Sequence, residues 1–403
     1  MDFAFGTEEK ALADSFRDFI KREVKPLEDT LRPIFLESDG DAPELREELL
    51  KIRRRSAELG FYSLDIPTEL GGGGLSYVGQ ALMREVAGAS GSFLAIACLS
   101  GPEGPTGLIQ GMKPALRDRL VPPFLRAEIS AAFGLTEPDA GSDNQSMKTR
   151  AVKDGDDWVI NGTKHFITNG QHADFIQLFA VTDQEKKAAG GVTCFVVEKG
   201  TPGFSVGKSQ AVIGDGEGPC ELVFEDCRVP DENVIGEVGM GFYAAMQFLT
   251  GGRANIGAMC VGIADYLLRA SVEYAKSRVQ FGKPIGKMQG VSFQLADMAL
   301  EVELARLATY KLAWLADQGE PLIQAAAFSK LYATEMVGRA ADTAIQVHGG
   351  IGLTRELGLE RIYRFVRILR VVEGTSEVQR YLIGKSLGLL DDSPGAASLL
   401  EHL

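Results

Sequence analysis

One carboxylate in the segment Arg370–Arg380 has the surroundings of a general base. Glu373 follows the largely apolar run 368–372 and is followed at once by Gly374. Burial beside such a run would raise the pKa of the carboxyl toward the range in which it can accept a proton. Gly374 would let the backbone approach a ligand closely. The alternative is an acid that is stabilised by the dipole of a following helix and has no catalytic role.

A helix is expected directly after this carboxylate. Ser376 and Gln379 have the spacing of a capping box, and Gly388 is a suitable stop, so the helix should run from Ser376 through Leu387. The exposed amides at its beginning could donate to a phosphate or to an enolate-like oxygen.

Three further segments carry groups that suit a polar or aromatic ligand. Leu135–Asp143 offers hydroxyls and amides, Arg278–Gly286 offers a guanidinium for phosphate and a ring at Phe281, and Gln346–Gly352 is a glycine-rich helix end. The alternatives are a linker turn, a loop between helices and a helix stop. His348 by itself is expected to be a hydrogen-bonded structural residue.

The composition is that of an ordinary globular protein. The 403 residues are 45% hydrophobic and 24% charged, with a formal net charge of −13, so a nucleic-acid partner is disfavoured. The five cysteines form no C-x-x-C pair, and no histidine stands at ligand spacing from them. Free thiols in a reducing compartment and no bound metal are therefore expected.

Targeting signals and membrane spans are not expected. The first nine residues are acidic and contain no apolar signal core, and no run approaches the roughly 20 apolar residues of a membrane helix. We therefore predict a cytoplasmic protein with no membrane partner.

The elements that must position these residues change type twice along the chain. Residues 1–130 have helical periodicity over 8–24 and 45–59, with Ser76 as the cap of a helix through Val86. Strands are expected in residues 131–238, with a hairpin turn at Asn161-Gly162. Their predicted ranges are 175–181, 191–197, 204–213 and 220–229. Helices return in residues 239–403, over 242–274, 291–315 and 325–347.

This order predicts an α+β multidomain protein. An N-terminal helical domain (1–130) should precede a middle β-barrel or sandwich domain (131–238) and a C-terminal helical bundle (239–403). The chain has no strand-linked G-x-G-x-x-G and no G-x-x-x-x-G-K-[ST], which disfavours a Rossmann or P-loop enzyme.

Taken together and in this order, the segments resemble the acyl-CoA dehydrogenases from about residue 10 to 388. The shared motifs are T-E-P-x-A-G-S-D, N-G-x-K-x-x-I-T-N-G, R-x-Q-F-G-x-P-I-x-x-x-Q, Q-x-x-G-G-x-G and E-G-T-S-E-x-Q-R. The resemblance implies two helical domains around a β domain, a four-helix C-terminal bundle, and FAD between the β domain and that bundle. It also implies a homotetramer built as a dimer of dimers and a role in fatty acid or acyl-CoA catabolism.

The resemblance also implies the contacts of the cofactor and substrate. Near the flavin it places Phe133, Leu135, Thr136, Ser142, Phe166 and Thr168, with Thr136 near the pyrimidine edge and Thr168 near N5. On the adenine-diphosphate part of a neighbouring subunit's FAD it places Arg278, Gln280, Phe281, Gln289, Gln346, Gly349 and Gly350. Thr375 and Glu377 would also touch the cofactor, and Ser142, Arg253 and Gly374 would form part of the acyl-CoA site.

Glu373 would be the base that removes the thioester α-proton while a β-hydride passes to the flavin. The N–H of Glu373 and a ribityl hydroxyl would stabilise the oxyanion, the product would be a trans-2-enoyl-CoA, and an electron-transfer flavoprotein would accept the electrons. Some relatives carry the base one residue before the arginine that aligns with Arg253. That position here is Gly252, which favours Glu373.

Several residues depart from the family pattern, and the identity of the acyl group stays open. Phe166 replaces a frequent Trp, Val372 a frequent Tyr, Phe365 a usual Asp, and Thr250 an Asp of many members. Three alternatives remain: a flavin oxidase or monooxygenase on the same fold, a non-catalytic FAD protein that binds DNA, and a partner subunit that binds FAD without substrate. The retained Glu373 argues against the first and the acidic net charge against the second.

Overall fold

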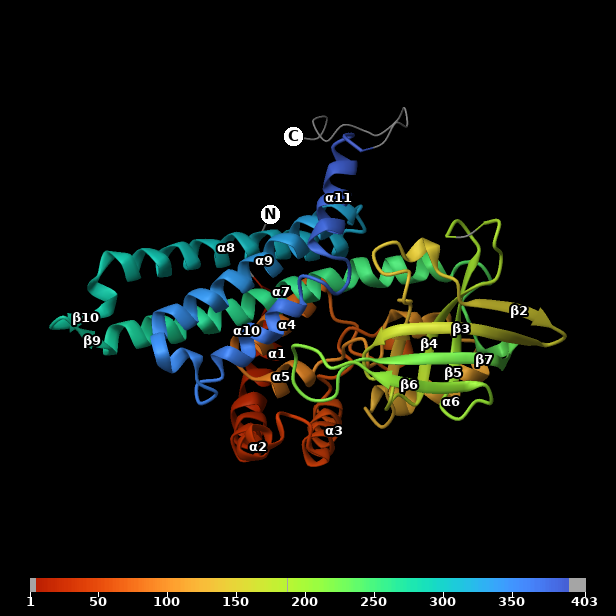
Figure 1. Ribbon diagram of the computed structural model, residues 1–403, viewed down its shortest axis with the longest axis horizontal. Helices are drawn as coiled ribbons and strands as arrows, with labels where there is room; N and C mark the ends of the chain where they lie inside the picture. The colour runs from red at the N-terminus through yellow and green to blue at the C-terminus, as the bar shows by residue number, and fades with distance from the viewer. Residues whose placement is uncertain (1–4, 187, 391–403) are drawn as a thin grey trace. The chain divides into compact units, whose positions relative to one another are not determined.

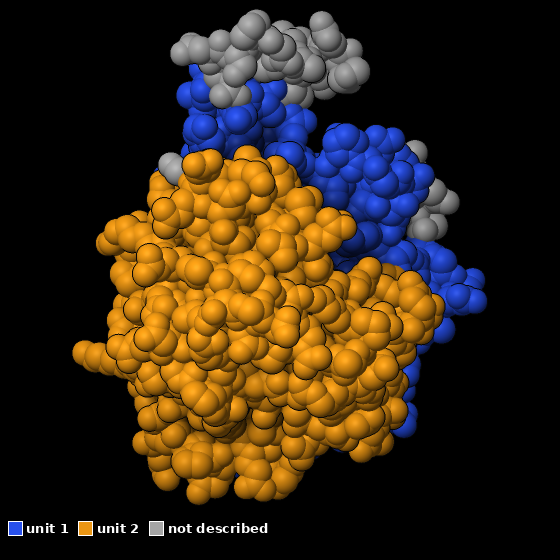
Figure 2. All heavy atoms as spheres, turned by 90° about the vertical axis from the view of Figure 1, so that its right-hand side faces the viewer, with its two compact units in different colours: residues 1–36, 76–96, 250–403 blue, residues 37–75, 97–249 orange. Residues whose placement is uncertain are grey.

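The computed structural model describes residues 5–186 and 188–390 and divides into two compact units (Figures 1 and 2). One unit consists of residues 1–36, 76–96 and 250–403, and the other of residues 37–75 and 97–249. The ends of the predicted first and third domains, at residues 1 and 403, lie outside the described residues. Helices precede and follow the strands along the chain, as predicted.

The first unit is helical. Its chain begins with α1 (Thr7–Phe19), which continues through a π-helical turn (Ile20–Val24) into α2 (Lys25–Ser38), so the helix predicted over 8–24 extends further. The next helices are α4 (Tyr77–Ala89) and α5 (Phe93–Ala97). The Ser76 side chain accepts a hydrogen bond from the Gly79 N–H at 3.0 Å, which confirms the predicted cap.

Three long helices form the body of this unit and run alongside one another in Figure 1. They are α7 (Gly241–Ser277), whose first residues belong to the other unit, α8 (Gln289–Asp317) and α9 (Ile323–His348). All three predicted helices are confirmed. Small buried side chains such as Ala264, Ala333 and Ala340 line their contact and let the helices pack closely. Two shorter helices follow, α10 (Leu359–Ile368) and α11 (Ser376–Ser386).

The second unit contains an eight-stranded sheet together with α3 (Pro43–Glu58) and α6 (Pro114–Leu125). The sheet order is β6-β7-β3-β2-β4-β5-β8, and β1 pairs with β4 in parallel. The strands are β1 (Ala131–Gly134), β2 (Arg150–Asp154), β3 (Asp157–Ile167), β4 (Phe175–Val181), β5 (Val192–Glu198), β6 (Phe204–Ser209), β7 (Cys220–Pro230) and β8 (Val234–Ile235). The four predicted strands are confirmed, although β6 ends earlier than residue 213.

Alternate residues of β4 belong to two separate cores, which explains why the whole strand is buried. Ile176 and Leu178 pack into a core formed among the strands, together with Trp158 and Phe195, whose rings lie 5.5 Å apart. Phe179 packs on the opposite face in a core that also contains residues of α6. A strand buried on both faces is typically a nearly continuous apolar run, and this one is interrupted only by Gln177.

The predicted hairpin at Asn161-Gly162 is wrong. Both residues lie inside β3, where the pairing with β7 shifts between Ile160 and Gly162. Gly162 has φ +150°, and a Cβ there would lie 2.5 Å from Oγ1 of Thr149, so the glycine serves a bulge rather than a turn. The real turn joins β2 and β3, with Asp154 paired to Asp157.

Candidate active site

Glu373 lies in the short connection between α10 and α11, both of the first unit, and thus shortly before a helix start, as the sequence predicted. Its backbone is left-handed, with φ +55°, and Gly374 follows with φ +92°. The predicted cap of α11 is one residue off, because Oγ1 of Thr375 accepts the Val378 N–H at 3.2 Å. Ser376 is instead the first helical residue, and its Oγ donates to Oε1 of Glu335 on α9 at 2.8 Å.

The Glu373 carboxylate is in the state expected of a base. Its Oε2 is buried and accepts no hydrogen bond from the described residues. Burial raises the pKa of Glu373 to about 7, although the positive charges of Arg253 and Lys330 oppose this shift. A carboxyl with a pKa near neutrality can take up a proton and release it again at physiological pH.

Arg253 on α7 is the cation that most strongly attracts this carboxylate. Its residue is only 7% exposed, and burial lowers the pKa of the guanidinium, with the charge of Glu373 acting in the opposite direction. The buried Nε of Arg253 donates to none of the described residues. The structure thus brings Glu373, Gly374 and Arg253 together, with a buried donor and a buried acceptor both available to a ligand.

A second group of predicted residues meets in the sheet unit, after β1 and at the end of β3. The Thr136 carbonyl accepts the His165 N–H at 2.9 Å, which places Leu135 and Thr136 beside the end of β3. Phe166 there has φ +56°, and 56% of the residue is exposed. Thr168 is exposed two residues further on. Hydroxyls and an exposed ring thus gather at one place in the unit.

A buried ion pair supports this group. Lys164 is fully buried, and its Nζ donates to the Leu135 carbonyl at 3.0 Å and to Oε1 of Glu137 at 2.8 Å. Glu137 also accepts the N–H groups of Lys148 and Thr149. Burial opposes the ionisation of Glu137, but Lys164 and these amides outweigh it and lower the pKa of the carboxyl. The pair therefore fixes the backbone on which Leu135 and Thr136 lie.

Two predicted flavin contacts have different surroundings. Phe133 on β1 is half-buried and packs against Phe179 and Phe248, with ring centroids 4.9 and 5.2 Å away. Ser142 is exposed in the turn after β1.

The residues predicted to hold the adenine-diphosphate part lie at one end of the first unit. Arg278, Gln280 and Phe281 are exposed on a small hairpin made of β9 (Val279–Gln280) and β10 (Lys283–Pro284). Gln289 begins α8, and Gln346, Gly349 and Gly350 are exposed at the end of α9. The ring of Tyr274 on α7 stacks on His348 with centroids 4.4 Å apart, which brings the two helix ends together. His348 also bonds the Ala344 carbonyl through Nδ1 at 2.7 Å, so its predicted structural role is confirmed.

Sequence reasoning missed two buried side chains at the Glu373 turn. Nζ of Lys330 on α9 donates to the Gly374 carbonyl at 2.7 Å, and Nε2 of Gln379 on α11 donates to the same oxygen at 3.0 Å. The signal for Lys330 was a lone cation in the otherwise apolar and hydroxyl-bearing stretch 325–334. Gln379 was noted only as a capping residue.

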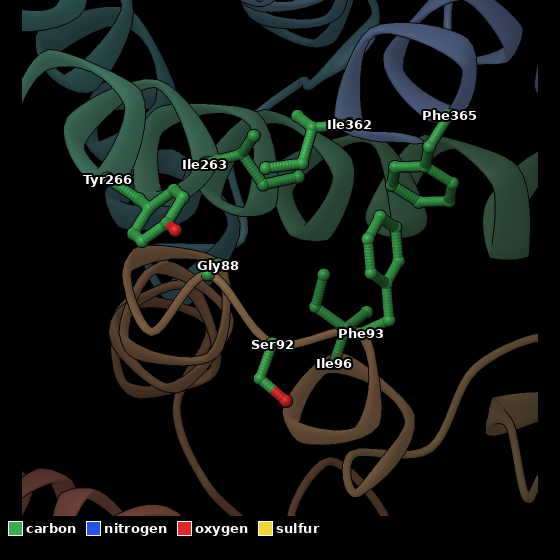
Figure 3. Close-up of a pocket in the computed structure, with 9 residues that line it drawn as sticks. Gly88, Ser92, Phe93, Ile96, Ile263, Tyr266, Ile362 and Phe365 are labelled. Carbon is green, nitrogen blue, oxygen red and sulfur yellow. The ribbon is translucent and has the colours of Figure 1, made fainter. Parts of the chain in front are cut away.

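Phe365, one of the departures from the family pattern, contributes to a small apolar pocket (Figure 3). Its ring meets that of Phe93 edge-on at 5.3 Å, and the side chains of Ile263, Tyr266 and Ile362 complete the walls. An aromatic side chain at 365 is therefore explained by a packing partner from α5. None of the predicted site residues lines this pocket.

Within the described residues, no group of three or more His, Cys, Asp or Glu side chains is arranged to hold a metal ion. None of the helices in that part of the chain has the length and apolar character needed to cross a membrane.

Family models match almost the whole chain in three consecutive parts. They are the N-terminal domain of acyl-CoA dehydrogenase over residues 6–128, its middle domain over 132–227 and its C-terminal domain over 239–388.

Individual relatives match over similar lengths. A probable acyl-CoA dehydrogenase of Bacillus subtilis is 36% identical, over 96% of this chain and 100% of its own. The structure of butyryl-CoA dehydrogenase from Megasphaera elsdenii superposes with a TM-score of 0.82 at 35% identity, covering 96% of this chain and 100% of its own. The FAD complex of PigA superposes with a TM-score of 0.87 at 30% identity, covering 97% of this chain and 100% of its own.

Proposed function

This chain belongs to the acyl-CoA dehydrogenase family, and we propose that Glu373 is the base of its reaction. The enzyme is an FAD-dependent dehydrogenase of acyl-CoA thioesters. In the proposed mechanism the Glu373 carboxylate removes a proton from the α-carbon, and the β-carbon loses a hydride, so that a trans-2-enoyl-CoA forms. FAD, when bound, supplies the acceptor of that hydride.

The observation that carries this proposal is the buried Oε2 of Glu373, which has no hydrogen-bond partner among the residues that the structure describes. An acid that served only the helix dipole of α11 would gain by exposure to solvent, where its charge is well hydrated. Here burial raises the pKa to about 7 while Arg253 and Lys330 limit the rise. The carboxylate is thus ionised enough at neutral pH to act, and basic enough to take a weakly acidic proton.

The chain offers suitable surfaces for the two ends of FAD. Phe166 and Phe281 both have left-handed backbones, which is uncommon for aromatic residues, and both present exposed rings, Phe281 at 93% exposure. In the proposed site the flavin contacts Phe133, Leu135, Thr136, Ser142, Phe166 and Thr168, and Thr375 and Glu377 also contact the cofactor. The adenine-diphosphate part of a neighbouring subunit's FAD contacts Arg278, Gln280, Phe281, Gln289, Gln346, Gly349 and Gly350.

Substrate contacts in the proposed site come from both the backbone and side chains. Arg253 and Ser142 hold the acyl-CoA, and the N–H of Glu373 donates to the thioester oxygen as negative charge develops there. Gly374, with its left-handed backbone and no side chain, lets the substrate approach this amide. Exclusion of water on binding would strengthen each of these interactions. An electron-transfer flavoprotein would then accept the electrons.

We further propose a homotetramer. Five large apolar side chains form an exposed stripe along α8, at positions with mostly heptad spacing: Phe293, Leu300, Leu304, Leu307 and Trp314. They are between 40% and 60% exposed. A continuous apolar stripe of this kind is typical of a helix that packs against another subunit. The α8 stripe would then be buried between copies of the chain.

All five cysteines are buried free thiols, which supports the proposal of a reducing, cytoplasmic location. The domain limits at about 130 and 238 also remain our proposal.

An anaerobic titration of the purified flavoprotein tests the reaction. A panel of straight, branched and cyclic acyl-CoA thioesters should contain at least one that bleaches the visible flavin absorbance. Reoxidation should be fast with an electron-transfer flavoprotein and slow with air. Rapid reoxidation by air alone would instead identify an oxidase, and a panel in which no thioester bleaches the flavin would contradict the proposal.

A further inference from the structure

The turn that carries Glu373 has an unfavourable backbone. Glu373 and Gly374 are consecutive left-handed residues, with φ +55° and +92°. The left-handed conformation costs a residue with a Cβ about 1–2 kcal/mol, so Glu373 would leave it if the surroundings did not fix the turn. A carboxylate on an unfixed turn would sample positions away from the substrate.

Two buried donors fix this turn from different helices. The Gly374 carbonyl accepts Nζ of Lys330 at 2.7 Å and Nε2 of Gln379 at 3.0 Å. Nε2 of Gln379 also lies 3.5 Å from the Glu373 carbonyl. Both side chains are fully buried. Two convergent hydrogen bonds on the Gly374 carbonyl set the orientation of the peptide between residues 374 and 375. They thereby restrain the turn and the direction in which the Glu373 side chain leaves the backbone.

Helix α9 holds the same turn at a second point. Glu335, five residues after Lys330, accepts a hydrogen bond from Oγ of Ser376 at 2.8 Å and forms an ion pair with Arg370 at 2.9 Å. The Ser376 N–H also donates to the Arg370 carbonyl at 3.1 Å. Glu335 therefore contacts the chain on both sides of Glu373. The turn is attached to α9 before, at and after the reactive residue.

Burial of the Lys330 ammonium, which holds the Gly374 carbonyl, has a desolvation cost. Burial lowers the pKa of Lys330 to about 8, although the charge of Glu373 favours the ammonium form. An apolar residue of similar length would fill the same space without this desolvation cost. A lysine at this buried position therefore points to a use of its hydrogen bond or its charge.

We propose that Lys330 is a positioning residue for Glu373: it holds the Gly374 carbonyl so that the base stays in the left-handed conformation that faces the substrate, with Gln379 as the second donor. This inference rests on the proposed role of Glu373 as the base. Lys330 does not touch the reacting atoms. Its effect passes through the peptide between residues 374 and 375 and through its charge.

The two donors differ in one respect that an experiment can use. Lys330 supplies a hydrogen bond and a positive charge, whereas Gln379 supplies only a hydrogen bond. Glu373 and Lys330 act on each other, and the other charged or titratable groups that act on them come from three helices. These are Arg84 on α4, Arg253 and Cys260 on α7, and Glu335 on α9. Loss of the Lys330 charge should raise the pKa of Glu373, whereas loss of Gln379 should leave that pKa unchanged.

The test uses Lys330→Met and Gln379→Met in the FAD-loaded enzyme, with the thioester that bleaches the flavin of the unchanged enzyme. Flavin reduction is followed by anaerobic stopped flow across pH. We expect the limiting rate to fall about 10- to 100-fold in both variants, because a displacement of about 1 Å costs this much. The thioester Kd should change by less than about threefold. Only Lys330→Met should move the pH midpoint upward, by about one unit, because removal of a nearby opposite charge raises the pKa of a carboxyl.

Lys276→Met is the matched control, because Lys276 is an exposed lysine that pairs with Glu273 by i,i+3 spacing. It should behave as the unchanged enzyme. If Lys330→Met leaves both the limiting rate of flavin reduction and its pH midpoint unchanged, the proposal is overturned. If Lys330→Met does not fold, the decision passes to Gln379→Met, and an unchanged rate in that variant overturns the proposal. Glu373→Gln distinguishes a failure of the proposed base from a failure of the proposed positioning role. If Glu373→Gln reduces the flavin normally, the proposed base is wrong. If Glu373→Gln is inactive while both methionine variants are normal, only the positioning role is wrong.

Discussion

A Cβ atom added to Gly252 would lie 3.3 Å from Oε2 of Glu373. Helix α7 therefore presents its glycine directly to the carboxylate, and the neighbouring Arg253 lies next in the same helix. Two positions far apart in the sequence, 252 and 373, thus face one site. A side chain at 252 would compete with the proposed base Glu373 for space, and a carboxylate there could replace it.

The first prediction follows from this contact. Glu373→Gly should slow flavin reduction about 100- to 10,000-fold, because proton abstraction by a positioned base contributes this much. Adding Gly252→Glu to that variant should raise the rate of flavin reduction again by at least about tenfold, because the new carboxylate would lie at the place that the Glu373 carboxylate occupied. The recovery is measured as the rate of flavin reduction by an acyl-CoA.

Gly251→Glu is the control for this relocation. A Cβ on Gly251 would lie 3.6 Å from the Tyr77 ring, and Glu373 is not among its neighbours. Combined with Glu373→Gly, this variant should recover nothing. Equal recovery from positions 251 and 252 would show that the two residues do not differ in access to the substrate.

The second prediction concerns pH. Burial raises the pKa of Glu373 from its ordinary value of 4.5 to about 7, and only the ionised form can accept the α-proton. The rate of flavin reduction should therefore rise with pH through a midpoint near 7 in the free enzyme. A rate that is flat from pH 5 to 9 would contradict the assignment.

Stability should change in the opposite direction over the same range. Between pH 4.5 and about 7, Glu373 is ionised in the unfolded chain but still largely protonated in the folded protein. The free energy of unfolding therefore falls as pH rises through this window. Glu373→Gln removes the cost, which is at most about 3 kcal/mol. The variant should unfold at a higher temperature than the unchanged protein at pH 8, and the difference should shrink toward pH 4.5.

The third prediction concerns the buried pair under Leu135 and Thr136. Lys164→Met leaves Glu137 buried without its cation, and the free energy of unfolding should fall by about 3–5 kcal/mol. Glu137→Gln added to Lys164→Met should restore part of this loss. Chemical denaturation of the FAD-loaded enzyme measures both. Lys148→Met is the control, because its pair with Asp139 is exposed and contributes at most about 1 kcal/mol.

The fourth prediction concerns assembly. Leu300→Asp places a charge in the α8 stripe and should convert the proposed tetramer into smaller species, because an unpaired charge is costly to bury between subunits. Light scattering after size-exclusion chromatography measures the mass. Gln318→Asp, just beyond the end of α8, is exposed and should leave the mass unchanged. A Leu300→Asp enzyme with unchanged mass would move the interface elsewhere.

Much of the fold could be predicted from the sequence because the patterns were long. The apolar stripes of α7, α8 and α9 indicate helices by their period, and the largely apolar run of β4 has the short length of a buried strand. The failures were local. Asn161-Gly162 is the usual signal of a turn, but here the pair accommodates a bulge beside Thr149, which the sequence does not place there.

The active-site prediction was limited for a different reason. Glu373 stood out because an acid, a glycine and a helix start were adjacent in the sequence. Lys330 did not, because it lies 43 residues earlier and meets the Gly374 carbonyl only once α9 and α11 are packed. The resemblance implied only that some relatives carry their base at the position of Gly252, and nothing local in the sequence indicates the contact of Gly252 with Glu373.

The rate of flavin reduction in Glu373→Gln tests the central claim most directly. The variant keeps the shape of the side chain and removes its ability to accept a proton. Stopped-flow mixing of the yellow, FAD-loaded variant with a reactive acyl-CoA under anaerobic conditions should leave the absorbance unchanged over a time in which the unchanged enzyme bleaches completely. Bleaching at the unchanged rate, with FAD fully bound, would contradict the account.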